Sequence, residues 1–350
     1  MTRPAAAATI GWGFFLSASW TWCIGMFLPF VLMWQYGSVG FLAFAIPNVV
    51  GCAAFGYILR RDDARALRER LGGWTKGFSW ATIAFQAWFA GWMLPWEIGL
   101  AVVIGALLLA RRWGSREWIL ASLVAAAVTA GCIFDGGRTA LASLPMQGSL
   151  PEADLYFLAP VIALGFLACP YLDLTFHRAL EESPSRHAFG IFGLLFAATL
   201  AGIATLWDPA PISAAIPWAL TILWAVQLMF TIGVHAREGL TPLEGARRSS
   251  RGAILFLALA ALATGWVVHS EAVYLRWLGF YGLLFPFFLV FRLRSVPTLW
   301  GWGAIAASLP CYELGFIRHE TVWLSLPLAL LVVLLMAPLD KGRRKEPLRA

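Results

Sequence analysis

Apolar residues follow one another in long runs along the whole chain, separated by short polar connections, and they do not alternate with polar residues. At a rise of 1.5 Å per residue, a helix of about 20 apolar residues crosses a hydrocarbon core about 30 Å thick. Continuous runs therefore predict membrane-spanning helices rather than the alternating strands of a membrane barrel. We predict about twelve such helices, which cover residues 8–35, 38–59, 78–95, 97–111, 116–135, 155–175, 188–207, 212–235, 252–269, 273–291, 297–316 and 321–339.

The Lys and Arg residues test this arrangement independently of the apolar runs. Membrane proteins carry an excess of basic residues in their cytoplasmic connections. With the N-terminus in the cytoplasm, all but three of the 26 Lys and Arg residues fall in segments on that side, the exceptions being Arg138, Arg276 and Arg318. The pattern therefore predicts an all-α polytopic membrane protein with both termini in the cytoplasm.

Composition narrows the class of protein further. The chain has 350 residues, of which 60% are hydrophobic and 13% charged, whereas soluble domains carry about 25% charged residues. The formal net charge of +7 lies in the clusters that orient membrane helices, so it predicts no nucleic-acid partner. We expect a multi-pass protein of a bacterial inner membrane with the lipid bilayer as its partner, and the sequence contains no indication of its oligomeric state.

Residues that carry chemistry are few and lie mostly at the predicted helix ends. Asp173 and His177 fall near one such end and are interpreted as interfacial residues that reach water. The five cysteines lack metal-ligand or redox spacing and are interpreted as small buried apolar residues. Paired carboxylates, a nucleophile elbow, a phosphate-binding loop and a metal-binding His pair are all missing from the sequence. We therefore expect no catalytic residues, no metal site and no cofactor, and the protein is not predicted to be an enzyme.

Two predicted helices, the first and the sixth, contain residues that interrupt regular helical structure. Hydroxyl, Gly and Pro residues free backbone groups, which persist inside a bilayer only where they line a cavity or bind something. Paired interruptions in two halves of a chain are the best sequence indication of a transporter site. The residues concerned are Ser17-Ala-Ser19, Thr21, Gly25 and Pro29 in the first helix, and Gly165 with Cys169-Pro-Tyr171 in the sixth.

These two helices stand five apart and run in opposite senses, as an inverted repeat of two five-helix units requires. Pro and Gly are also common in ordinary membrane helices, so composition alone leaves the repeat open. The predicted organisation is a single transmembrane domain, 1–350, with repeat one at 8–136, repeat two at 155–291, extra helices at 297–339 and a cytoplasmic tail at 340–350.

The residues around both interruptions resemble the sodium:solute symporter family. Leu16 to Trp22, followed by the turn Tyr36-Gly-Ser-Val-Gly40, is similar to the family's first core helix. Gly165 to Leu180 is similar to its sixth core helix, and Phe134-Asp-Gly-Gly-Arg138 resembles a Gly-Gly element after the fifth. The resemblance covers about residues 8–240, and its motifs are loose.

The resemblance implies a five-plus-five inverted-repeat transporter of the leucine-transporter type, with alternating access around helices one and six. It implies a sodium site formed by Ala18, Ser19 and Thr231, the last from helix eight. It also implies that the solute is bound by Ser17, Ser19, Trp20, Trp22, Cys169 and Tyr171.

The chain departs from the family pattern at two places that bear on the coupling ion. Family members place an adjacent pair of hydroxyl residues on helix eight, whereas this helix offers only Ser213, Thr221, Gln227 and Thr231. His177 stands where the family has Gln before the Arg. The coupling ion is therefore left open between sodium, a proton and none.

Three functions remain in consideration. The leading hypothesis is a secondary transporter that moves a small polar organic solute by alternating access. The second keeps the transporter fold without transport, as a sensor or structural membrane component. The third is a membrane-embedded enzyme that acts on a lipid-linked substrate, for which the outer segment 136–154 with Asp135, Arg138, Glu152 and Asp154 is the candidate region.

Overall fold

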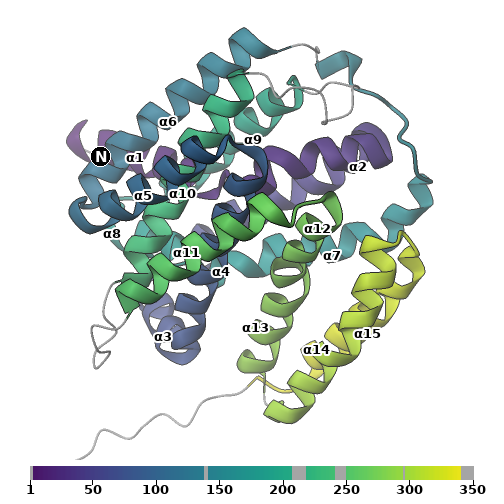
Figure 1. Cartoon of the computed structure of the whole chain (residues 1–350). Helices are drawn as coiled ribbons and strands as arrows, with labels where there is room; N and C mark the ends of the chain where they lie inside the picture. The colour runs from purple at the N-terminus through teal and green to yellow at the C-terminus, as the bar shows by residue number, and fades with distance from the viewer. Residues whose placement is uncertain (1–2, 138–140, 207–217, 241–249, 295, 340–350) are drawn as a thin grey trace, which may run out of the picture.

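The computed structural model describes residues 3–137, 141–206, 218–240, 250–294 and 296–339, and helices make up most of these ranges (Figure 1). Within them the chain forms no strand. The α-helices are α1 (Arg3–Trp20), α2 (Cys23–Ile58), α3 (Arg61–Leu71), α4 (Gly73–Met93), α5 (Trp96–Arg112), α6 (Ser115–Gly136), α7 (Leu155–Ala168), α8 (Leu174–Glu182), α9 (His187–Ala204), α10 (Trp218–Leu240), α11 (Ser250–Val267), α12 (Glu271–Gly279), α13 (Phe285–Leu293), α14 (Thr298–Tyr312) and α15 (Ser325–Met336).

Several of these helical stretches are long and apolar enough to cross a membrane, so the prediction of an all-α, multi-pass membrane protein is confirmed at this level. The count of twelve spans and the inverted repeat stay predictions. The beginning of the predicted span 212–235 and the predicted tail 340–350 lie outside the described residues. The six qualifying stretches are Cys23–Ile58, Ser115–Gly136, Glu152–Tyr171, His187–Ala204, Trp218–Gly239 and Glu271–Leu293.

A sharp corner divides α2 where the sequence places the boundary between the first two spans. Gly37 has a φ of 65° and a ψ of −158°, a conformation that side chains with a Cβ rarely adopt. A Cβ at Gly37 would also lie 2.6 Å from the carbonyl oxygen of Met146, in the segment that precedes α7. The glycine of the predicted aromatic-glycine turn is therefore required both by the backbone and by the close approach of that segment.

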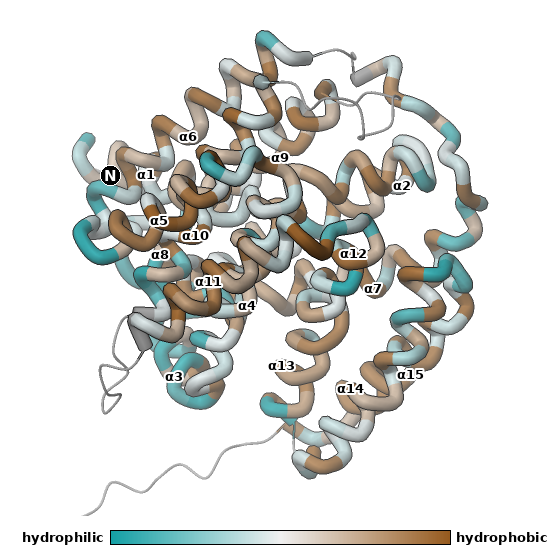
Figure 2. Tube along the Cα trace, viewed as in Figure 1, coloured by the Kyte–Doolittle hydropathy of each residue, from teal (hydrophilic) through white to brown (hydrophobic). Residues whose placement is uncertain are grey.

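Helix α3 is an element that the apolar pattern did not predict. It is short and strongly charged, and the hydropathy-coloured trace shows it as the most hydrophilic helix (Figure 2). Asp62 and Asp63 occupy its first turn and Arg68 and Arg70 its last, which matches the direction of the helix dipole. The sequence predicted only a polar connection between two spans here. Helix α3 is too short for its apolar and polar residues to show a clear helical period.

Helices α4 and α11 pack closely against each other. A Cβ at Gly91 would lie 2.1 Å from the carbonyl oxygen of Leu262, and one at Gly265 would lie 2.0 Å from that of Trp88. Membrane helices pack this closely where small residues let the backbones approach, because lipid supplies no hydrophobic force between them. Helix α4 is thereby held as a fixed support beside the two interrupted helices described below.

Candidate functional site

The first interruption separates α1 from α2 at Thr21 and Trp22. The Thr21 hydroxyl donates to the Ser17 carbonyl at 2.7 Å, and the Thr21 amide bonds to the same oxygen at 3.0 Å. The Trp22 amide turns back onto the Trp20 carbonyl at 2.8 Å, and the Trp22 indole N–H donates to the Ser19 carbonyl. Side chains that bond to helical carbonyls in this way bend or end helices.

The second interruption lies between α7 and α8 and contains the short 3-10 turn Cys169–Tyr171. Pro170 in this turn has no N–H to continue the helix. The Asp173 amide bonds to the Cys169 carbonyl at 3.1 Å, and Asp173 Oδ1 then accepts the Thr175 amide at 2.8 Å. Asp173 is thus the N-terminal cap of α8, and the chain restarts as a helix at that point.

The two interruptions lie against each other, although they are about 150 residues apart in sequence. The hydroxyls of Ser19 and Thr175 are 3.4 Å apart, and the rings of Trp20 and Phe176 have centroids 4.9 Å apart. The structure therefore brings together the two segments that the sequence singled out.

A cavity of about 50 Å³ lies between the interrupted helices. A volume of this size holds a few water molecules. None of the residues that line it is charged, and most are apolar or aromatic. Around the first interruption the lining includes Trp20 of α1, Trp22, and Ile24, Gly25 and Asn48 of α2, and around the second it includes Val161 and Gly165 of α7 and Cys169. Tyr281 and Gly282 of the π-helical turn Phe280–Leu284 and Tyr312 of α14 complete the part of the wall considered below.

Polar side chains from neighbouring helices satisfy the backbone groups that the first interruption frees. Gln86 of α4 accepts the Cys23 amide at 3.2 Å, and the Tyr274 hydroxyl of α12 donates to the Cys23 carbonyl at 3.2 Å. Asn48, farther along α2, accepts the Trp20 indole N–H at 2.7 Å. These bonds fix the interruption in place, because a buried backbone group without a partner is costly in lipid.

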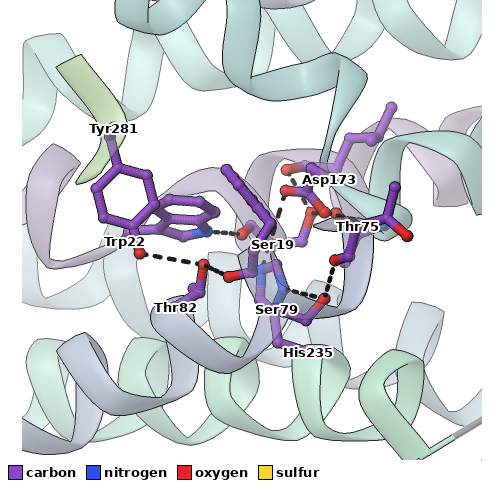
Figure 3. A network of polar contacts seen from close by, with 11 residues as sticks. Ser19, Trp22, Thr75, Ser79, Thr82, Asp173, His235 and Tyr281 are labelled. Atoms are coloured by element: carbon purple, nitrogen blue, oxygen red, sulfur yellow. Dashed lines mark hydrogen bonds and ion pairs between the residues drawn. The ribbon is translucent and has the colours of Figure 1, made fainter. Parts of the chain in front are cut away.

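A buried polar cluster lies beside the cavity, where α4, α8 and α10 meet (Figure 3). His235 of α10 places Nε2 3.9 Å from Asp173 Oδ2 and Nδ1 3.5 Å from the Ser79 hydroxyl of α4. The Trp22 ring, which lines the cavity, packs edge-on against the His235 ring at 5.4 Å. The cluster therefore touches the cavity wall through Trp22.

Ion pairs and hydrogen bonds tie α8 to its neighbours at the end of the molecule where α3 lies. Arg178 of α8 pairs with Glu238 of α10 at 2.7 Å, and both side chains are nearly buried. Arg61 of α3 donates to the carbonyls of Leu180 and Ser183 at the end of α8. The position of α8 therefore depends on side-chain contacts as well as on the chain itself.

The structure divides the predicted solute-binding residues into two groups. Trp20, Trp22 and Cys169 line the cavity, whereas Ser17, Ser19 and Tyr171 are not among the lining residues. The Ser19 hydroxyl donates to the Leu16 carbonyl at 3.0 Å, and Tyr171 packs on Phe55 with ring centroids 5.2 Å apart.

The predicted sodium ligands Ala18, Ser19 and Thr231 are all buried. The Thr231 hydroxyl has no hydrogen-bond partner among the described residues. The clusters of His, Cys, Asp and Glu that hold most metal ions are not found in the described part of the chain.

The interpretation of Asp173 and His177 as residues that reach water is wrong. Both are fully buried, as is His235. Asp173 faces inward because it caps α8 from within the interruption, and His177 Nε2 bonds to the Tyr171 carbonyl at 2.9 Å. The signal that could have revealed them is their position directly after the Cys169-Pro170-Tyr171 interruption, where a freed helix start needs polar partners.

Fold and site together define a helical multi-pass membrane protein with two interrupted helices around a small cavity. No protein-family model matches the chain, and no curated protein or solved structure matches it either.

Proposed function

We propose that this protein is a secondary transporter that moves a small organic solute by alternating access at the cavity between its two interrupted helices. The observation that carries the proposal is the contact of these interruptions, Thr21–Trp22 and Cys169–Asp173, around one buried cavity. Discontinuous helices that meet near the middle of a bundle are the usual site of solute binding in such transporters. The resemblance to sodium:solute symporters supports the same assignment.

The distribution of basic residues gives the proposed transporter an orientation. Helix α3, with its Arg residues, would face the cytoplasm, so that the contacts of α8 with α3 and α10 close the cavity on that side. On the other side, Gln35 donates to Glu271 at 3.1 Å, and the Ser149 and Leu150 amides bond to the carbonyls of Trp34 and Gln35. In this orientation the two sets of contacts would hold the helices together on the cytoplasmic and on the outer side.

The lining of the cavity narrows the class of solute. Aromatic and aliphatic side chains surround it, and the polar side chains in the wall, such as Asn48, are engaged with other protein groups. A solute that carries a full charge would leave that charge unpaired in a low-dielectric site, at a cost of several kcal/mol. We therefore propose an uncharged solute with an apolar body, less polar than the sequence alone suggested.

The candidate region for an enzyme has less support. Asp154 is occupied as the acceptor of the Thr321 hydroxyl at 2.8 Å, and Glu152 is exposed. Arg138 lies outside the described residues.

The test is transport by the purified protein in liposomes, measured as counterflow of labelled solutes from a panel of uncharged aromatic and aliphatic compounds, amino acids and sugars. We expect saturable counterflow of one class of uncharged solute, absent from empty liposomes. Solute binding without counterflow would replace this proposal with a sensor that retains the transporter fold.

A substitution that adds a methyl group inside the cavity tests whether the solute binds there. A Cβ at Gly282 meets only Val161, at 3.6 Å, so Gly282→Ala should fold normally while it takes volume from the cavity. We expect the apparent affinity for the solute to fall about tenfold, or about 1.4 kcal/mol, with an unchanged melting temperature. The control is Gly303→Ala in α14, where an added Cβ meets nothing within 4 Å and affinity should not change. Equal affinities for the two variants would place the solute elsewhere.

A further inference from the structure

Asp173 holds a carboxyl oxygen that no group in the described part of the chain satisfies. Its side chain is fully buried, and Oδ1 accepts the Thr175 amide at 2.8 Å. Oδ2 has no hydrogen-bond partner among the described residues. An ionisable group buried in a membrane protein is expensive and is usually retained for function, above all in ion or proton pathways.

His235 presents the complementary unsatisfied atom. Its Nε2 also has no hydrogen-bond partner in the described part of the chain, and it lies 3.9 Å from Asp173 Oδ2. The Ser79 hydroxyl donates to the Thr75 carbonyl at 3.4 Å, so its oxygen can accept a hydrogen bond from His235 Nδ1–H at 3.5 Å. With that bond, the ring hydrogen of neutral His235 is on Nδ1 and Nε2 directs a lone pair at the carboxylate, whereas the other tautomer directs Nε2–H at Asp173 Oδ2.

In the first of these tautomers two lone pairs face each other in a buried site and repel, and one added proton removes the conflict. On Asp173 Oδ2 the proton makes a carboxylic acid that donates towards Nε2, and on Nε2 it makes an imidazolium beside a carboxylate. The gap of 3.9 Å is longer than a direct hydrogen bond, so a small approach of α8 to α10 accompanies proton binding.

The other titratable groups around the pair are engaged elsewhere. Glu238 is paired with Arg178, while Cys52, Cys169 and Tyr281 lie near Asp173 and make hydrogen bonds of their own. His177 bonds to the Tyr171 carbonyl. Other charged groups of α3, α4, α8 and α10 are engaged as well: Arg61 donates to the α8 carbonyls, Arg68 pairs with Glu181, and Glu182 pairs with Arg178. Arg70, Lys76 and Arg237 have interactions of their own, and the remaining charged residues of α3, which are Asp62, Asp63, Arg65 and Glu69, are exposed.

We propose that Asp173 and His235 together bind one exchangeable proton, and that this proton is the coupling ion of the transport proposed above. The inference rests on the proposed function only for the coupling, since proton binding stands by itself. Asp173 caps the N-terminus of α8, and His235 belongs to α10. Protonation of the pair therefore controls how closely α8 is held to α10. The proton enters from one aqueous side and forms an O–H or N–H bond with a lone pair of Asp173 or His235. That bond breaks when the proton leaves to the other side, and the lone pair returns to the same atom.

Proton binding is tested on the full chain in lipid nanodiscs without any solute. Infrared difference spectra across a pH titration should show the C=O stretching band of a buried protonated carboxyl. Asp173→Asn should abolish this band while its amide oxygen still caps α8. His235→Gln should shift the midpoint of the titration, and Glu152→Gln, at an exposed acid, should leave it unchanged. A wild type in which neither a protonated-carboxyl band nor an imidazolium band titrates, or a titration that is unaltered in Asp173→Asn, would overturn the proposal.

Trp22 provides a second readout, because a change in the charge or hydrogen bonding of an imidazole in contact with an indole alters the fluorescence of the indole. Its ring lies 5.4 Å from that of His235. We expect a pH-dependent emission change that disappears in Trp22→Phe and in His235→Gln, and that is the same in sodium and choline buffers. A transition driven by sodium at fixed pH would contradict the proposal.

Coupling is tested in liposomes with the solute that the counterflow panel identifies. One coupled proton supports an accumulation ratio of about 10 per unit of pH gradient, since a tenfold ratio corresponds to about 1.4 kcal/mol. Asp173→Asn should lose this accumulation and keep solute exchange. Transport that follows sodium and ignores pH overturns the inference and leaves the proposed function intact. A titrating carboxyl in a protein that moves no solute upholds the proton site and removes the proposed function.

Discussion

Replacing Arg178 with Met should destabilise the protein by about 3 kcal/mol, because it leaves Glu238 buried without its closest cation. Removing one partner of a buried ion pair typically costs about 3–5 kcal/mol. The Arg178 and Glu238 side chains are 12% and 8% exposed, so water screens the remaining charge poorly. The lower end of the range applies because Arg237 still acts on the carboxylate. The measurement is thermal or denaturant unfolding in nanodiscs, followed by Trp fluorescence.

A double variant distinguishes the effect of the lost charge on stability from the effect of the lost side-chain packing. Adding Glu238→Gln to Arg178→Met removes both charges and should recover most of the lost stability, since neutral replacements of buried pairs are often tolerated. Arg186→Met, at an exposed position, should change stability by no more than about 0.5 kcal/mol. If the double variant were as unstable as Arg178→Met, the loss would come from packing of the arginine stem. In the proposed transporter, the double variant should also open more readily towards the cytoplasm.

Gly91→Val should destabilise the fold by about 3 kcal/mol or more, the upper end of the range for overpacked cores. A Cβ at this position would lie 2.1 Å from the Leu262 carbonyl oxygen and 3.0 Å from the Trp266 amide nitrogen. Both atoms belong to the backbone of α11, so no side-chain rotation relieves the contact. Helix α4 would have to move away from α11 and would carry Gln86 away from the first interruption.

Gly77→Val in the same helix is the matched control. An added Cβ at Gly77 meets nothing within 4 Å, so the two variants share the helix and the residue change but not the contact. We expect Gly77→Val to purify as wild type, whereas Gly91→Val should give little folded protein by size-exclusion chromatography. Similar yields and melting temperatures for both would contradict the close packing of α4 and α11.

The sequence predicted the places where the chain bends better than the side chains that meet there. Pro170 lacks an amide hydrogen, Thr21 bonds back to a helical carbonyl and Gly37 takes a positive φ. Each of these is a local property, so the residue type reveals it. The pairing of Asp173 with His235 depends on how α8 and α10 lie side by side, which no local pattern encodes.

For the predicted solute-binding residues too, the sequence indicated the region but not which side chains face the cavity. Successive residues of a helix point about 100° apart, so neighbours in sequence face different surroundings. Trp20 lines the cavity, while Ser19 beside it turns to the Leu16 carbonyl and Thr175. Hydroxyl residues at an interruption therefore identified the region, and the rotation of α1 decided which of them face the cavity.

The corner of α2 and the segment before α7 are joined through backbone atoms, with Ser38 N–H bonded to the Pro145 carbonyl and Leu150 N–H to that of Gln35. Bonds of this kind do not depend on side-chain identity, so most positions along the contact are free to drift during evolution. Gly37 and Gly148 cannot be replaced in this way, because a Cβ at either would lie 2.6 Å or less from backbone atoms of the other segment. Distant relatives of this chain should therefore be recognised by this pair of glycines, set between apolar spans, more readily than by overall identity.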